Sequence, residues 1–391
     1  MTNAGLSLFA LYMLIPSEFG IFSWVLSLLF VVSGVVQGGL LTPVTIVFGR
    51  LRNSGAAYEF ILQAALRYFI VVTTIGMIWL IWGEGEFFTA ATLVLLLFAY
   101  VVKDVCCRMF LNQRVAFVSL IVNFAIFCSV TLTLSMFSMK ALELSAISVL
   151  LVFGSSTAVV CTLVLLFRNE RGIYRVSGFS LRRINYLARF ELVSSVALAV
   201  KAHFPVLIAP VFFQLHGVAA IAESRLLSSF PLLLLPVIGQ LLLARFSAVS
   251  ASEPGSVVLR TAVRSTTPAL QLFCVVFLIS ALGAVYIVVR PGILSELGIL
   301  DRAVMLPELL LWWHVYALVW LFRIATQTWL QAAGLSKPYL NLNVITSLPA
   351  LVVSLMLCEL GCTSGAIVGL IISELTLGIF GIRLMRSMIA K

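Results

Sequence analysis

Ionisable side chains within long apolar stretches are the residues of this 391-residue chain best suited to chemistry. A charge at the centre of a bilayer costs about 2.5–3.5 kcal/mol on insertion scales, so these groups are expected to face protein or water. The bases in such stretches are Arg67, Lys103, Arg189, Lys201, Arg225 and Arg323, and the acids are Asp104, Glu191, Glu223 and Glu374. Because the bases outnumber the acids, the pattern favours a cavity that binds anions.

Polar and aromatic residues accompany two of these bases at helical spacing. The stretch 304–332 carries one such series, Tyr316, Trp320, Arg323, Gln327 and Gln331. The stretch 218–246 carries another, Arg225, Ser229, Pro236 and Gln240. Steps of three or four residues place each series on one helix face. Guanidinium forks match phosphate oxygens, and nearby aromatic rings can stack on sugars, so we expect a hydrated cationic cavity. Close helix packing is the alternative reason for polar stripes.

These patterns define the candidate site residues. The residues expected to bind an anionic substrate are Lys201, Arg225, Arg323, Lys103, Arg67, Trp320 and Gln327. The acids Glu374, Glu223 and Asp104 are candidates for coupling to protons or sodium, although Asp104 lies four residues before Arg108 and could pair with it.

No catalytic residue, metal site or cofactor is expected. The histidines His203, His216 and His314 lie far apart in the chain, and the seven cysteines lack metal-ligand spacing. The chain has no GxxxxGK[ST] phosphate-binding loop, which argues against an ATP-driven pump.

The composition of the chain shows which kind of secondary structure must position these residues. Hydrophobic residues make up 62% of the chain and charged residues 10%, with a mean hydropathy of +1.15. A soluble domain has about 25% charged residues, and a membrane β-barrel alternates polar and apolar positions, so both classes are excluded. The chain is therefore predicted to be an all-α polytopic membrane protein.

About twelve stretches are candidate transmembrane helices of about 20 residues. They are 4–15, 21–46, 59–82, 88–110, 115–135, 145–167, 186–212, 218–246, 266–289, 304–332, 339–357 and 364–385. The first is short, because a dozen helical residues rise only about 18 Å.

The loops between these stretches differ in charge. From a cytoplasmic N-terminus, one set of loops carries sixteen basic residues and the other only Lys140, Arg290 and Arg302. Cytoplasmic loops are enriched in Lys and Arg, so both termini are predicted to face the cytoplasm. Orientation thus explains most of the net charge of +10, and a nucleic-acid partner is not expected. The basic segment 168–185 is predicted to link an N-terminal lobe, 1–167, to a C-terminal lobe, 186–391, each with six helices.

Three segments resemble the MATE-related (MOP) flippase superfamily, and in particular its Wzx-type polysaccharide exporters. Ile15–Gly55 contains a Pro-x-x-Phe-Gly turn before a long helix and a basic loop, and Arg225–Val249 resembles the eighth helix, without its usual proline near the basic end. Trp329–Phe380 contains an Ala-Gly turn and the sequence Gly361-Cys-Thr-Ser-Gly-Ala366 before the last helix. The resemblance implies a MATE-like fold of two six-helix lobes around a cavity.

The function expected from the residues and the resemblance together is that of a flippase. It would move polyprenyl-diphosphate-linked oligosaccharide across the bacterial cytoplasmic (inner) membrane by alternating access, for exopolysaccharide or lipopolysaccharide biosynthesis. Expected partners are this lipid-linked oligosaccharide, membrane lipids, and a polysaccharide polymerase and chain-length regulator. One alternative is a multidrug or cation antiporter, which would favour acids in its cavity. Another is a membrane polymerase or ligase, which would need a longer outer loop than this chain has.

Overall fold

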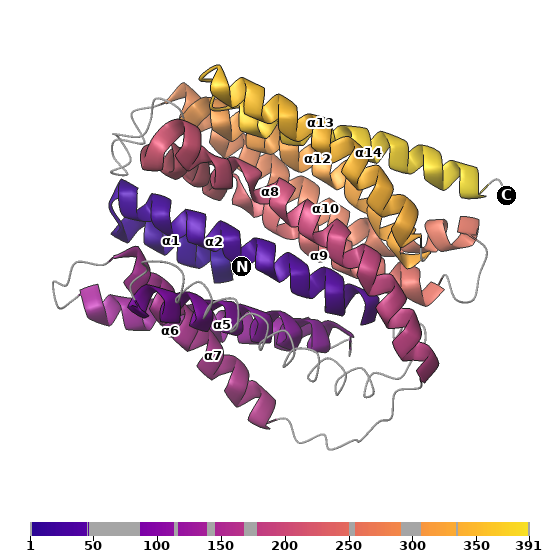
Figure 1. The fold of residues 1–391 in the computed structure, drawn as a ribbon, viewed down its shortest axis with the longest axis horizontal. Helices are drawn as coiled ribbons and strands as arrows, with labels where there is room; N and C mark the ends of the chain where they lie inside the picture. Colours follow the sequence, from indigo (N-terminus) through magenta and orange to yellow (C-terminus); the bar gives the residue numbers. More distant parts are fainter. Residues whose placement is uncertain are drawn as a thin grey trace. The chain divides into compact units, whose positions relative to one another are not determined.

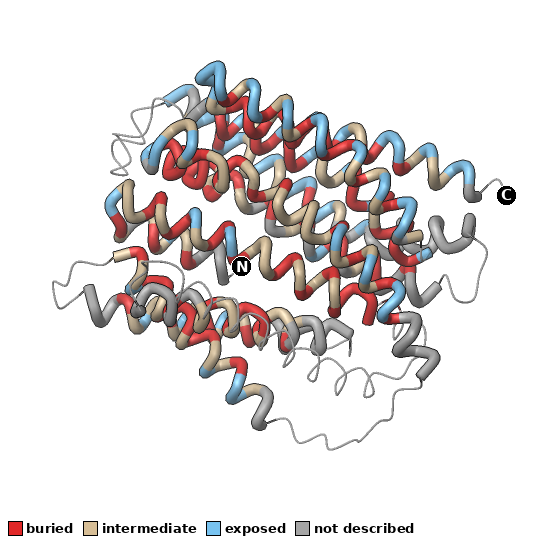
Figure 2. Tube along the Cα trace, in the orientation of Figure 1, coloured by how far each residue is buried: buried red, intermediate tan, exposed pale blue. Residues whose placement is uncertain are grey.

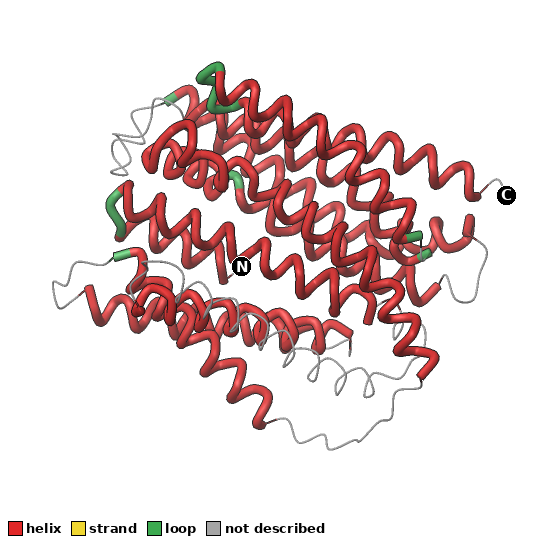
Figure 3. Tube along the Cα trace, in the orientation of Figure 1, coloured by secondary structure: helices red, strands yellow, loops and turns green. Residues whose placement is uncertain are grey.

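The computed structural model describes residues 2–44, 46, 87–112, 116–138, 145–167, 178–249, 255–290, 306–333 and 335–389. Nearly all of these residues are helical, and none lies in a strand (Figure 3). The prediction of an all-α protein is therefore confirmed. The predicted span 59–82, with Arg67, lies outside the described residues.

The helices follow the predicted apolar stretches closely. They are α1 (Thr2–Met13), α2 (Pro16–Val36), the π-helical η1 (Gln37–Leu41), α5 (Phe87–Asn112), α6 (Ala116–Ser138), α7 (Ala146–Phe167), α8 (Gly178–Leu227), α9 (Ser229–Val249), α10 (Gly255–Val289), α12 (Leu306–Ala332), α13 (Ser336–Glu359) and α14 (Gly365–Ile389). Within the described part of the chain, seven helical segments are long and apolar enough to cross a membrane. The chain is a polytopic membrane protein.

The chain divides into two compact units, Met1–Val196 and Ala197–Lys391, and the boundary falls inside α8. Part of the predicted linker is helical, because α8 begins at Gly178, whereas residues 168–177 lie outside the described residues. The lobe boundaries at 167 and 186 stay a prediction.

In the first unit, α5 packs against α7, α6 and α2, and α1 packs against α6 and α2. Glu18 in the first turn of α2 accepts a 2.8 Å hydrogen bond from the backbone N–H of Ala146, the first residue of α7. Backbone N–H groups in the first turn of a helix lack intrahelical partners, so a carboxylate there stabilises the helix. Glu18 thereby ties the start of α2 to the start of α7.

Replacing Glu18 with Ala is expected to lower the free energy of unfolding by about 1 kcal/mol, the usual value of a helix cap. The melting temperature of the purified protein in detergent measures this. Glu359→Ala is the matched control, since Glu359 is exposed. Equal melting temperatures for the two variants would contradict the capping role.

In the second unit, α14 packs against both α13 and α12, while α9 packs against α10 and α12 (Figure 1). Buried and exposed positions alternate along α12, α13 and α14, since each helix presents one face to its neighbours (Figure 2). Gly365, Gly369 and Ser373 recur every four residues on α14, and small residues at this spacing let helix backbones approach closely. A Cβ atom at Gly369 would overlap Ser354 and the carbonyl oxygen of Ala350 on α13.

The turn between α13 and α14 fixes their antiparallel arrangement. Gly361 has a φ of 79°, a left-handed conformation that glycine adopts without strain. The N–H of Cys362 donates to the carbonyl of Leu357 at 3.0 Å, and the N–H of Gly361 donates to that of Cys358 at 3.0 Å. This pair of bonds is the Schellman motif that ends many helices. The resemblance in this segment thus corresponds to a defined helix–turn–helix geometry.

One predicted helix differs from the structure, and one predicted helix boundary agrees with it. The helix expected at 218–246 is interrupted at Ser228, between α8 and α9. Pro231 lacks an N–H, so the carbonyl of Leu227 loses its helical partner, which accounts for the break. α8 itself is interrupted at Gln214, with a φ of 56°, between the predicted spans 186–212 and 218–246.

Candidate functional site

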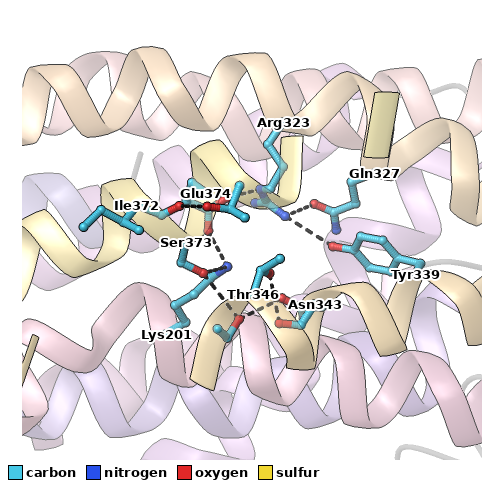
Figure 4. Close-up of polar contacts among 11 residues, drawn as sticks. Lys201, Arg323, Gln327, Tyr339, Asn343, Thr346, Ile372, Ser373 and Glu374 are labelled. Carbon is cyan, nitrogen blue, oxygen red and sulfur yellow. Dashed lines mark hydrogen bonds and ion pairs between the residues drawn. The ribbon is translucent and has the colours of Figure 1, made fainter. Parts of the chain in front are cut away.

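Two basic side chains and one acidic side chain, from three helices, meet in the second unit (Figure 4). The ammonium group of Lys201 on α8 lies 2.8 Å from Oε1 of Glu374 on α14, and the Nε atom of Arg323 on α12 pairs with Oε2 of the same carboxylate. The exposed fractions of Lys201, Arg323 and Glu374 are 1%, 4% and 1%. We call these three residues the Lys–Glu–Arg cluster.

Neutral side chains hold the arginine of the cluster in place. Nη1 of Arg323 donates to Oε1 of Gln327, one turn along α12, and to the hydroxyl of Tyr339 on α13 at 3.3 Å. The orientation of the guanidinium plane is therefore set from its own helix and from a neighbouring one.

The lysine of the cluster is hydrogen-bonded to the first of a series of hydroxyl and amide groups. Its ammonium donates to Oγ of Ser373 at 3.1 Å, and Ser373 donates to Oγ of Ser347 at 3.5 Å. Ser347 in turn donates to Oδ1 of Asn343 at 3.1 Å. The cluster is thus surrounded by side chains that can exchange hydrogen bonds with a polar ligand.

The cluster has an excess of positive charge, because two bases share one carboxylate. Buried charges are stable only when they are paired and hydrogen-bonded, and removal of one partner of a buried pair costs about 3–5 kcal/mol. One unit of positive charge remains for an anion to balance. A phosphate group suits this position, because guanidinium and ammonium groups both bind phosphate oxygens.

Replacing Tyr339 with Phe is expected to lower the free energy of unfolding by about 1.5 kcal/mol, the low end for a hydrogen bond to a charged group. The same substitution at Tyr286, which is 50% exposed, is the matched control and should have little effect. Melting temperatures in detergent compare the two variants. An unchanged value for Tyr339→Phe would show that its hydroxyl does not support Arg323.

A second basic group of this unit, Arg225, lies against a histidine and an indole. Its Nη1 atom is 2.9 Å from Nδ1 of His203, and its guanidinium carbon lies 5.3 Å from the ring centroid of Trp313. A guanidinium can only donate, so Nδ1 of His203 accepts and the imidazole is neutral in this arrangement. The contact with the indole face is a cation–π interaction.

Three aromatic rings follow one another along α12. The ring centroids of Trp313 and Tyr316 are 5.6 Å apart, and those of Tyr316 and Trp320 are 5.7 Å apart. Among the described residues, no hydrogen-bond acceptor reaches Nε1 of Trp320, although this atom is buried. The series leads from the Arg225 contact toward Arg323.

The first unit holds a polar cluster of its own. The hydroxyl of Ser33 donates to Oδ2 of Asp104, and Nε2 of Gln37 donates to Oγ of Ser33 at 3.3 Å. The ammonium of Lys103 lies 5.0 Å from the ring centroid of Tyr100 and 5.9 Å from that of Phe153. Gln37 belongs to the π-helical segment η1, a distortion often found at functional sites.

The predicted residues are divided between the two units, and the second unit brings several of its own together. Lys201 and Arg323 pair with Glu374, which the sequence suggests only as a coupling group, and Gln327 accepts a hydrogen bond from Arg323. Arg225 and Trp320 are linked by aromatic contacts, and Glu223 is completely buried. Lys103 and Asp104 belong to the first unit, and Arg67 lies outside the described residues.

Sequence reasoning missed the hydroxyl and amide side chains of the cluster. Tyr339, Asn343 and Ser347 are each one turn apart on α13, and all three are buried. This four-residue spacing of polar residues in an apolar helix was visible in the sequence and is the signal that could have identified them.

Comparisons with known proteins relate this geometry to a fold. No protein-family model matches the chain, and no curated protein is detectably similar in sequence. Solved structures do match: an inward-facing multidrug resistance MATE family transporter of the MOP superfamily has a TM-score of 0.68 at 14% identity, covering 100% of this chain and 94% of that one. A MATE protein solved in complex with the molecule MaL6 has a TM-score of 0.70 at 14% identity, covering 100% and 92%.

A third matching structure is described by the polarity of its own binding pocket. It is a MOP superfamily transporter from Pyrococcus furiosus, described as having a binding pocket of reverse polarity that suggests a different function. Its TM-score is 0.67 at 14% identity, covering 100% of this chain and 91% of that one. At these identities the likeness establishes the fold: the chain has the fold of MATE transporters.

Proposed function

We propose that this protein is a membrane transporter for an anionic cargo, and specifically a flippase for polyprenyl-diphosphate-linked oligosaccharide. The Lys–Glu–Arg cluster is the observation that carries the proposal. Two buried bases share one carboxylate on α14, within a fold otherwise found in transporters. The diphosphate of the cargo would bind Lys201 and Arg323, while the polyprenyl tail would stay in lipid.

The surroundings of the cluster suit a sugar-bearing cargo. Trp320 and the adjoining rings offer stacking surfaces, and Nε1 of Trp320 offers a donor to a sugar hydroxyl. Gln327 and Asn343 offer amide groups, and Ser347 and Ser373 offer hydroxyls. Arg225, Lys103 and Arg67 are proposed to provide further positive charge along the path of the headgroup.

The loop charges support an orientation for the protein in its membrane. We place it in the bacterial inner membrane with both termini in the cytoplasm. The expected partners are the lipid-linked oligosaccharide and membrane lipids, with a polysaccharide polymerase and a chain-length regulator acting on the product.

The cellular test is a deletion strain. It is expected to accumulate the lipid-linked oligosaccharide at the inner leaflet and to stop exporting polymer. The wild-type gene should restore export, and a gene carrying both Lys201→Ala and Arg323→Ala should not, although its product still reaches the membrane. Restoration by the double variant would exclude the cluster as the cargo site.

A second candidate function is exchange of cationic drugs, since the first structural match is a multidrug resistance transporter. Glu374 and the aromatic series on α12 would then bind a cation. The excess of positive charge in the cluster argues against this function. Efflux of ethidium from cells, measured with and without the gene, distinguishes the two candidates.

A further inference from the structure

The carboxylate of Glu374 lies where the anionic group of the cargo would bind. Its Oε1 atom is paired with Lys201 at 2.8 Å and its Oε2 atom with Arg323, so each oxygen has one cation (Figure 4). A phosphate that bridges the same two cations must take the place of this carboxylate. We infer that Glu374 is a built-in counter-anion which the cargo displaces, so that protonation of Glu374 and binding of the anion favour each other. This inference rests on the proposed function.

The two bases need such a counter-anion whenever no cargo is bound. Without it, two positive charges with exposed fractions of only 1% and 4% would be left, among the described residues, with the neutral partners named above. Unpaired buried charges are strongly unfavourable, so the carboxylate stabilises the site between transport events. When the cargo binds, its own negative charge pairs with both bases. A carboxylate left beside the bound anion would repel that anion. Uptake of a proton by Glu374 removes that repulsion.

Glu374 is the only acid of the Lys–Glu–Arg cluster, so its charge is the one that the cargo would replace. The charged or titratable groups that face it are Lys201 on α8, Arg323 and Tyr316 on α12, and Tyr339, which reaches Arg323 from α13. Because proton uptake by Glu374 and anion binding favour each other in this arrangement, anion affinity should be highest at acid pH and should fall as the pH rises.

The sign of this linkage determines the direction of coupling. If a proton and an anion each favour binding of the other, the reciprocal effect must hold as well. An exchanger instead needs the proton and the cargo to exclude each other. Through Glu374, a proton would therefore travel with the anion in the same direction, and an inward proton gradient would not by itself drive export.

Calorimetric titration of the purified full-length protein tests the inference, with geranyl diphosphate as the probe between pH 5.5 and 8. The wild type should bind more tightly as the pH falls, while Glu374→Gln should bind at least about tenfold more tightly than the wild type at pH 8 because it lacks the competing charge. The probe and His203 are the same in the wild type and in Glu374→Gln. Any pH dependence that the wild type shows in addition to that of Glu374→Gln is therefore due to Glu374. Glu359→Gln, at an exposed acid, should behave as the wild type.

A parallel titration uses sulfate, whose charge is constant in this range. If Glu374→Gln does not fold, His203→Gln decides the question, because it removes a second buried ionisable group, which contacts Arg225, while Glu374 remains. Retained acid-strengthened sulfate binding in His203→Gln supports the inference, and its loss overturns it.

The remaining outcomes separate the inference from the proposed function. Equal or weaker anion binding by Glu374→Gln, together with wild-type binding that Lys201→Ala abolishes, would overturn the inference and leave the proposed function standing. Failure of the wild type to bind either probe at any pH would overturn both.

Discussion

Replacing Arg323 with Ala should reduce translocation of the anionic lipid-linked cargo by at least about tenfold, because a hydrogen bond between charged groups, here guanidinium and phosphate, contributes about 1.5–3 kcal/mol. Arg323 pairs with Glu374 and also donates to Gln327 and Tyr339. Its removal leaves Glu374 with Lys201, so the cluster loses both its excess positive charge and the fork that matches phosphate.

The measurement is the rate at which the cargo becomes accessible on the far side of proteoliposomes. Arg323→Lys keeps the charge and loses the planar fork, so its rate should be intermediate. Arg386→Ala is the matched control, because Arg386 is exposed near the end of α14. An Arg323→Ala rate close to that of Arg386→Ala would exclude Arg323 from the cargo path.

Gly369→Leu should destabilise the second unit by about 3 kcal/mol or more, at the upper end of the usual cost of overpacking. A side chain at Gly369 would overlap Ser354 and the carbonyl of Ala350, and the backbone of α13 cannot move aside as a flexible side chain can. Because Glu374 lies just over one turn farther along α14, separation of α14 from α13 would also disturb the Lys–Glu–Arg cluster. Transport should therefore be lost together with stability.

The chain offers a matched control for this substitution. Gly283 on α10 is exposed, and a Cβ atom there would meet nothing within 4 Å, so Gly283→Leu adds the same side chain in open space. The melting temperature and the yield of monodisperse protein in detergent compare the two variants. A Gly369→Leu protein as stable as Gly283→Leu would show that α13 and α14 are not in close contact.

The sequence predicted much of the fold because the bilayer restricts the possible structures. Long apolar stretches without alternation must form helices, and the described helices follow them, with α13 and α14 beginning within three residues of the expected positions 339 and 364. The break at Ser228 was harder to place, since a proline can either bend a helix or interrupt it. The π-helical segment at Gln37–Leu41 has no periodic signal of its own.

The candidate site could be predicted only in part. The cost of burying charge singled out Lys201, Arg323 and Glu374, and helical spacing placed Gln327 beside Arg323. Periodicity describes one helix at a time, so it could not show that residues of α8, α12 and α14 meet. From the sequence alone, Glu374 is therefore predicted only to couple ions. Its pairing with Lys201 and Arg323 is visible only in the structure.

Translocation in proteoliposomes that contain the purified protein as their sole protein tests the central claim most directly. Two cargoes are compared in the same vesicles: a polyprenyl-diphosphate-linked disaccharide and the cation ethidium. A cationic site predicts that the lipid-linked sugar crosses, that Lys201→Ala and Arg323→Ala together stop it, and that ethidium does not exchange. Ethidium exchange without movement of the lipid-linked sugar would contradict the account.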